Sequence, residues 1–125
     1  MEDWQGEETM TADDCIFCKI VARCIPATLV YEDDRAIAFK DIKPEAPVHL
    51  LVVPKAHIPK IGDVTEERQA LLFHLFQTAH HVAQQAGIAD DGYRLVINSG
   101  DNGGQTVHHL HIHVLGGRFM RWPPG

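Results

Sequence analysis

Three histidines alternate with aliphatic residues in the stretch HHLHIHVLGG, residues 108–117. Strict alternation is typical of a β-strand, which would place His109, His111 and His113 on one face and the aliphatic side chains on the other. Neighbouring histidines would then lie about 6.6 Å apart at Cα, and the outer two about 13 Å. We expect the aliphatic face to be buried and the histidine face to border a surface or cleft.

Such a row could carry out chemistry at phosphorus. Imidazole titrates near neutral pH, so much of it is an unprotonated nucleophile at pH 7. Its attack on phosphorus would give a phosphorus–nitrogen intermediate that water can cleave later. Neighbouring histidines could fix the tautomer of the nucleophile, donate to phosphoryl oxygens and protonate a leaving amine. The row therefore predicts a nucleophile, its supporting donors and room for one metal ligand.

A glycine-rich turn, DNGGQT at residues 101–106, directly precedes the histidines. Gly103 and Gly104 would let the backbone turn tightly and present N–H groups to an anion. Gln105 and Thr106 could add side-chain donors, and Asn98, at the end of the preceding strand, could face the same place. A pair of glycines alone is usually only a turn, but its position beside the histidines favours a phosphate site.

Cys15 and Cys18 form a Cys-x-x-Cys pair, which is common spacing for half of a zinc site. A redox pair is disfavoured because no strand-to-helix pattern of the thioredoxin type precedes it. Two thiols without a function are the remaining alternative. Cys24 has no partner in spacing, and we expect it to be a small buried hydrophobic residue.

Composition limits the class of protein. The 125 residues are 45% hydrophobic and 22% charged, which predicts one globular domain, residues 14–125, after a mobile acidic tail, residues 1–13. A net charge of -6 without a basic patch argues against nucleic-acid binding. We expect a cytoplasmic protein with no membrane association, because neither a membrane-spanning run nor a signal peptide is present. Three cysteines argue against a disulfide framework.

The pattern of elements predicts an α+β fold with a mainly antiparallel sheet and helices against one face. A short helix in CIFCKIVARC would end at Pro26, and a long helix would run from a capping box at Asp63 and Glu66 to Gly87. Strands are expected at residues 28–31 and 36–39, in VHLLVVPK up to Pro54, in YRLVINSG and along the histidine row. Three further histidines are expected to be solvated on the long helix: His74, His80 and His81.

The motif HLHIHVL matches the histidine-triad pattern, and IFCKI, PVHLLVVPK, GGQT and the ending RWPPG together resemble the Hint branch of the histidine triad (HIT) nucleotide-binding proteins. This resemblance implies a five-stranded sheet with one long and one short helix, and a homodimer whose sheet is continuous. It also implies hydrolysis of purine nucleoside 5′-phosphoramidates, derivatives of AMP or GMP, through a covalent nucleotidyl-histidine. No catalytic metal and no organic cofactor are implied.

Residue roles also follow from the resemblance. His111 would be the nucleophile, and the other catalytic histidines would be His113, His49 and His109. His113 and Thr106 would contact the phosphate, Asp41 would bind the ribose hydroxyls, and Trp122 would lie near the active site of the neighbouring subunit. The implied nucleotide-binding set comprises Ile16, Phe17, Ile20, Phe39, Asp41, Ile42, Asn98, Gly104, Gln105, Thr106, His111, His113 and Trp122. Phe39 and Ile42 could instead belong to the core.

Other histidine-triad relatives use the cysteine pair in a zinc site, with His57 and His109 as the candidate partners here. We expect one structural zinc on Cys15, Cys18, His57 and His109, separate from the nucleophile. Two rival functions stay open. A zinc hydrolase would use His109 and His111 as ligands of a catalytic metal, and a noncatalytic nucleotide-binding or scaffold protein would bind nucleotides without turnover.

Overall fold

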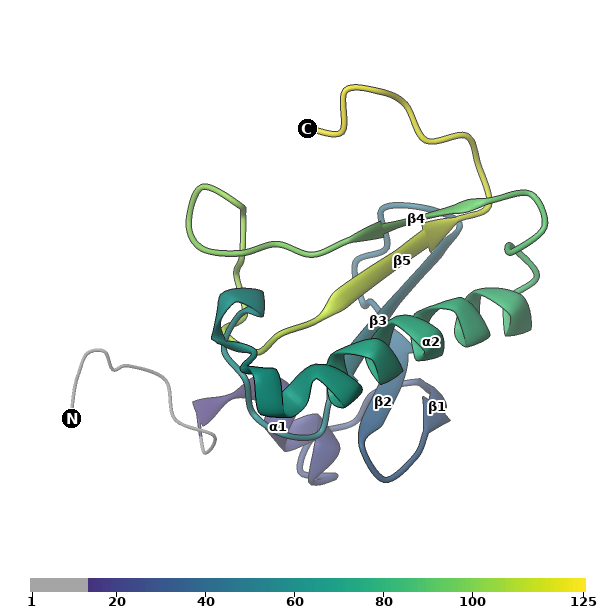
Figure 1. Ribbon diagram of the computed structural model, residues 1–125. Coiled ribbons are helices and arrows are strands. Elements are labelled where there is room, and N and C mark those ends of the chain that lie inside the picture. Colours follow the sequence, from purple (N-terminus) through teal and green to yellow (C-terminus); the bar gives the residue numbers. More distant parts are fainter. Residues whose placement is uncertain (1–13) are drawn as a thin grey trace.

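The computed structural model describes residues 14–125, so the predicted tail lies outside the described residues. Five strands form one antiparallel sheet in the order β1-β2-β3-β5-β4 (Figure 1). The strands are β1 (Leu29–Glu32), β2 (Ala36–Lys40), β3 (Val48–Pro54), β4 (Tyr93–Val96) and β5 (Ile112–Gly116). The helices are α1 (Ile16–Val21) and α2 (Gln69–Gln85). The predicted α+β class and the five-stranded sheet with one long and one short helix are confirmed.

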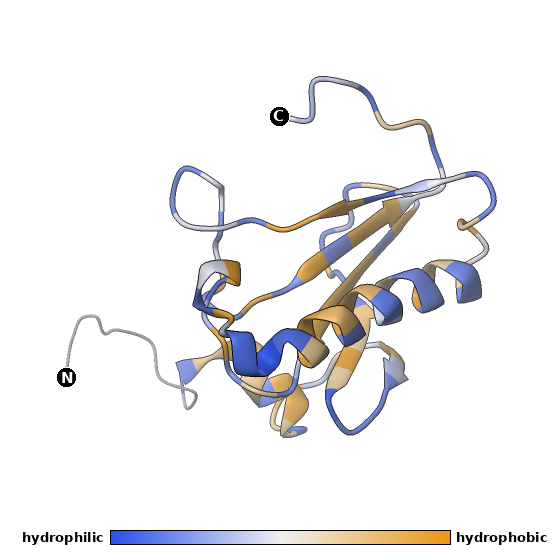
Figure 2. Cartoon of the chain, in the orientation of Figure 1, coloured by the Kyte–Doolittle hydropathy of each residue, from blue (hydrophilic) through white to orange (hydrophobic). Residues whose placement is uncertain are grey.

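The two helices cover opposite faces of the sheet. Residues of β2 and β3 alternate between two hydrophobic clusters, one with Leu50 and Val52 against α2 and the other with Leu51 and Val53 against α1. The prediction of helices on one face is therefore wrong. Both central strands are apolar at nearly every position, so both faces must be covered (Figure 2).

Two predicted helix ends are wrong and one is confirmed. The expected capping-box residues lie in two short 3₁₀ turns, Ile61–Asp63 and Glu66–Arg68, and α2 begins only at Gln69, without a side-chain cap. Pro26 does not end α1, because the chain has already left the helix at Arg23, whose φ is 64°. Gly87 does close α2, with a φ of 78° that glycine adopts without strain.

One histidine on α2 is a structural residue. His74 Nε2 lies 2.6 Å from Asp33 Oδ2, which also accepts a 2.7 Å bond from the hydroxyl of Tyr31. Burial alone would raise the pKa of Asp33, but these bonds and two main-chain N–H donors hold it well below its usual range. The prediction of a solvated His74 is wrong, whereas His80 and His81 are exposed as expected.

Cys24 is exposed, so the prediction that it is buried is wrong.

Neither helix in residues 14–125 combines the length and the apolar character that a membrane span requires.

Candidate active site and metal centre

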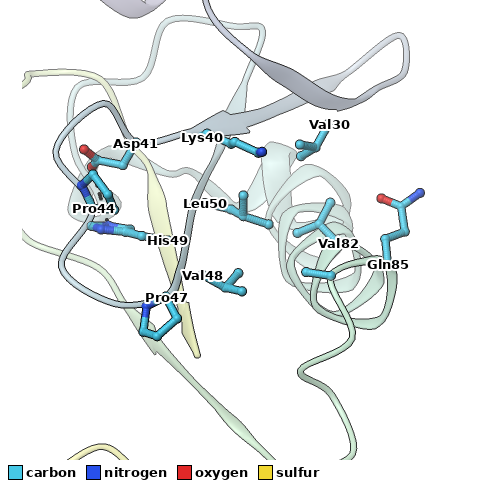
Figure 3. Close-up of a pocket in the computed structure, with 11 residues that line it drawn as sticks. Val30, Lys40, Asp41, Pro44, Pro47, Val48, His49, Leu50, Val82 and Gln85 are labelled. Atoms are coloured by element: carbon cyan, nitrogen blue, oxygen red, sulfur yellow. Dashed lines mark ion pairs between the residues drawn. The ribbon is translucent and has the colours of Figure 1, made fainter. Parts of the chain in front are cut away.

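The pairing of β3 with β5 brings two histidines together. Leu51 is paired with His113 and His49 with Leu115, so His49 and His113 are diagonal neighbours on the α1 face of the sheet. Their rings meet with His49 Nε2 2.9 Å from His113 Nδ1. Asp41, just beyond β2, places Oδ2 3.5 Å from His49 Nε2 (Figure 3).

Hydrogen bonding assigns the tautomers of this pair. The main-chain N–H of Glu45 donates to His49 Nδ1 at 3.0 Å, so the proton of neutral His49 is on Nε2. That Nε2–H donates to His113 Nδ1, which leaves the proton of His113 on its own Nε2. Burial and the neighbouring His111 and His49 lower the pKa of His113 to about 4. Near neutral pH, His113 is therefore a neutral hydrogen-bond donor.

His111 has the opposite tautomer. Its Nδ1 lies 2.7 Å from the main-chain oxygen of His109 and must donate to it, so Nε2 keeps a free lone pair. The edge-to-face ring of Phe17, 5.1 Å away between centroids, fixes the orientation of the imidazole. Burial lowers the pKa of His111, which favours the unprotonated, nucleophilic form. The ring of His113 lies 4.9 Å away, so donor and nucleophile are neighbours.

His109 is completely buried rather than on a cleft, and His111 is only 6% exposed. Strand pairing begins at Ile112, so the prediction of a strand along the whole row is wrong. β3 ends at Pro54, which has no N–H for the ladder, and its carbonyl oxygen accepts a 2.8 Å bond from His109 Nε2. The main-chain N–H of Leu110 donates instead to Ile58, on the segment that follows β3. Both faces of residues 109–111 are therefore covered.

Four possible metal ligands converge behind the histidine row. Cys15, Cys18, His57 and His109 place one ligand atom each within 4.8 Å of the others. His109 Nδ1 lies 3.3 Å from Cys15 Sγ and 3.2 Å from His57 Nδ1, and Cys18 Sγ lies 3.2 Å from His57 Nδ1. Ligand atoms around a tetrahedral zinc lie about 3.3–3.8 Å apart, so the donor set fits zinc.

The protonation of this cluster also suits a metal. Because His109 Nε2 donates to the carbonyl of Pro54, its Nδ1 carries the lone pair. Burial lowers the pKa of His109 to about 4, so it is neutral near pH 7. Burial and the neighbouring Cys15 raise the pKa of the Cys18 thiol to about 12, so zinc would have to displace that proton. Cys15 is the N-cap of α1, which brings both thiols to the start of this helix.

A second group, Asp41, His49 and His113, is also close enough for a metal. The tautomers argue against one, because His49 Nε2 carries a proton as long as Nδ1 accepts from Glu45. Neither of the two potential metal groups among residues 14–125 includes His111. This arrangement disfavours the zinc-hydrolase alternative, in which His111 is a ligand.

The glycine-rich turn is built tightly but offers fewer donors than predicted. A Cβ on Gly103 would lie 2.3 Å from the main-chain oxygen of Ser99, so only glycine fits there. The main-chain N–H groups of Gly104 and Gln105 already donate to Asp101 and Gly100. The N–H of Gly104 therefore belongs to the turn, and nucleotide binding at Gly104 stays a prediction.

Gln105 is also a structural residue. Its side-chain oxygen accepts from the N–H of Gly100, and its amide nitrogen donates to the carbonyls of Pro59 and Val107. Asn98 Nδ2 donates to the carbonyl of Gly103 and braces the same turn. Thr106 is exposed and remains the candidate donor at this end of the row.

Most residues of the predicted purine slot are buried. Three of its expected residues, Phe17, Ile20 and Phe39, are buried in the cluster between α1 and the sheet. Ile16 is 47% exposed and Ile42 is 90% exposed, so these two leave apolar surface uncovered. The purine slot on these five residues stays a prediction.

Two other features lie apart from the row. Trp122 is 80% exposed, and Arg94 lies 6.0 Å from the centre of its ring.

A cavity of about 680 Å³ opens on the α2 side of the sheet, lined by Val48, Leu50 and Val82, with Asp41 and His49 at one end (Figure 3). Neither His111 nor His113 lines this cavity.

Sequence reasoning missed the main-chain partners that assign the tautomers, those of Glu45, Pro54 and His109. No residue type reveals a main-chain contact, so only the fold could show them. Phe17 was expected to contact a purine, but it packs against His109 and His111.

Comparison with known proteins places these features in context. A model of the HIT domain family matches residues 22–120. An uncharacterised HIT-like protein of Synechococcus elongatus is 56% identical over 114 residues, 91% of this chain and 99% of that protein. The crystal structure of a HIT family hydrolase from Legionella pneumophila matches with a TM-score of 0.87 and 51% identity, over 89% of this chain and 99% of that one. A histidine triad nucleotide-binding protein from Candida albicans matches with a TM-score of 0.74 and 28% identity, over 87% and 82%.

Proposed function

Because the chain belongs to the HIT domain family, we propose that it is a hydrolase of purine nucleoside 5′-phosphoramidates. The observation that carries this proposal is the pair of opposite tautomers, an Nε2 lone pair on His111 beside an Nε2–H on His113. A phosphoryl group needs both, a nucleophile for phosphorus and a donor for its oxygens. One similar protein is named a hydrolase and another a nucleotide-binding protein, which supports the coarser proposal that the chain hydrolyses a nucleotide.

The reaction would proceed in two displacements at phosphorus. His111 Nε2 forms a bond to phosphorus while the bond to the amine breaks, and the amine leaves as it takes up a proton from water. Neutral His113 does not surrender its proton but donates a hydrogen bond to a phosphoryl oxygen. Water then attacks phosphorus and gives up a proton to the hydroxide left by the first step, the bond to Nε2 breaks, and the nucleoside monophosphate leaves with neutral His111 restored. Burial lowers the pKa of both His111 and His113, which favours their neutral forms before the substrate binds.

Mass spectrometry tests the covalent step. The protein is mixed briefly with adenosine 5′-monophosphoramidate, quenched and digested, and an adenylyl group is expected on His111. Tight nucleotide binding without an adduct or turnover would instead favour the noncatalytic binding or scaffold function. An adduct on another residue would contradict the assignment of the nucleophile.

We also propose one structural zinc per chain, held by Cys15, Cys18, His57 and His109. When bound, it would cross-link the start of α1 to the segments that carry His57 and His109. Four protein ligands leave no open position for water, so this zinc would have a structural role. His109 connects it to the nucleophile, because its ring faces the metal cluster while its carbonyl accepts from His111.

A homodimer of the Hint type is a further part of this proposal. β4 is one of the two outer strands of the sheet, and its free edge could pair with a second copy. The partner subunit would bury four aromatic side chains that are exposed in the single chain: Phe73, Phe76, Phe119 and Trp122. Light scattering at micromolar concentration should give twice the chain mass, and a monomer would contradict the dimer. Deleting residues 119–125 should change the preference for the leaving amine if Trp122 contributes to the neighbouring active site.

A further inference from the structure

We propose that Arg118 is a positioning residue for His113, acting through the loop between β2 and β3; its effect on catalysis rests on the proposed function. Arg118 follows β5, and one guanidinium nitrogen donates to the carbonyl of Glu45 at 2.9 Å. A second nitrogen donates to the carbonyl of Phe119 at 3.1 Å, which holds the side chain in place. The same residue, Glu45, provides the N–H that fixes the tautomer of His49.

The two ends of the loop are held differently: a main-chain hydrogen bond closes its start, whereas only side chains bond to the backbone around Glu45 among residues 14–125. At its start, the N–H of Asp41 donates to the carbonyl of His49 at 3.0 Å, and Asp41 Oδ1 accepts from the N–H of Lys43 at 2.8 Å. Within residues 14–125, two side chains bond to the backbone of Glu45: His49 accepts from its N–H and Arg118 donates to its carbonyl. Among residues 14–125, Arg118 is therefore the charged group that anchors the peptide unit after Glu45 Cα, while the N–H of the peptide unit before it donates to His49.

The approach of Arg118 to the loop is built into the backbone. Gly117 has a φ of 92°, and a Cβ there would lie 2.8 Å from Cβ of Pro47. Only glycine allows the turn after β5 to pack this closely against the loop. This packing brings Arg118 to the loop directly after the strand that carries His113.

The consequence is a chain of oriented donors. Arg118 holds the Glu45 carbonyl and so restricts the backbone rotation at Glu45 that would turn its N–H away, the Glu45 N–H fixes the proton of His49 on Nε2, and that proton occupies Nδ1 of His113. Without Arg118, the Glu45 N–H can turn away, and His49 can then carry its proton on Nδ1. Its Nε2 would become an acceptor, which would favour a proton on Nδ1 of His113 and leave His113 Nε2 without a donor hydrogen.

Arg118→Ala tests this proposal, with Arg121→Ala as a matched control that removes the same charge from the same segment. Arg121 is exposed, three residues farther along. Two measurements are needed: kcat and KM for adenosine 5′-monophosphoramidate, and ¹⁵N NMR of the imidazole nitrogens in the protein without substrate. For Arg118→Ala we expect mixed tautomers of His49 and His113, and a kcat lower on the order of tenfold with KM little changed. Arg118→Lys should recover much of both, and Arg121→Ala should match the wild type.

The two readouts separate this proposal from the proposed function. Wild-type protein that does not hydrolyse the substrate, together with altered tautomers in Arg118→Ala, would refute the function and support the positioning role. Unchanged ¹⁵N spectra of His49 and His113 in Arg118→Ala would overturn the positioning role, whatever happens to kcat. Arg118→Lys reports on the role in the same way if the alanine variant is unstable.

Discussion

His111→Asn should fold normally and lose hydrolysis of adenosine 5′-monophosphoramidate by about 10⁴-fold or more in kcat. The substitution removes the Nε2 lone pair that would form the covalent bond to phosphorus. The asparagine amide can still occupy the place of Nδ1 and donate to the carbonyl of His109, which explains why we expect little change in folding. Steady-state kinetics and thermal unfolding of the variant measure the two effects.

His108→Asn is a suitable control for this variant. His108 directly precedes the alternating row and is exposed, so the same substitution there leaves the buried imidazoles in place. We expect its kcat to stay close to that of the wild type. Near-normal activity of His111→Asn would show that His111 is not the nucleophile, whereas equal losses in both variants would indicate a general disturbance of this segment.

The sequence predicted the sheet well because the pattern of its strands is local. β2 and β3 are short apolar runs bounded by charged residues or proline, and such runs identify strands without tertiary information. The expectation that helices cover only one face of the sheet is wrong, and the sequences of β2 and β3 already argue against it. Both strands lack the polar alternation of a solvated face. An apolar residue at every position is itself the signal that a helix covers each side.

The histidine row shows where a periodic pattern stops being informative. Alternation predicted which side chains share a face but not which of them are buried. The structure buries both His109 and His111. Their cover comes from α1 and from the segment after Pro54, which are distant in the sequence. The glycine-rich turn shows a related limit, because Gln105 looks like a free donor until its three main-chain partners are known.

Replacement of both Cys15 and Cys18 by serine should remove one zinc per chain and lower the melting temperature by about 10 °C or more. In the wild type, zinc would join the start of α1 to two segments that otherwise contact it only through side chains. Without the metal, the buried thiols and imidazoles would lose their common partner. Elemental analysis of protein purified without chelator and thermal unfolding of both forms measure these effects, and Cys24→Ser, which removes an exposed thiol, is the control.

The same variant tests how far the metal affects catalysis. Because the carbonyl of His109 assigns the tautomer of His111, loss of the metal should loosen that contact and lower kcat by about 10- to 100-fold, far less than His111→Asn. Wild-type protein that contains no metal would rule out the zinc site. Complete loss of turnover in a metal-free protein that remains folded would instead favour a catalytic metal, and would mean that the lone pair of His111 is used for coordination rather than for attack.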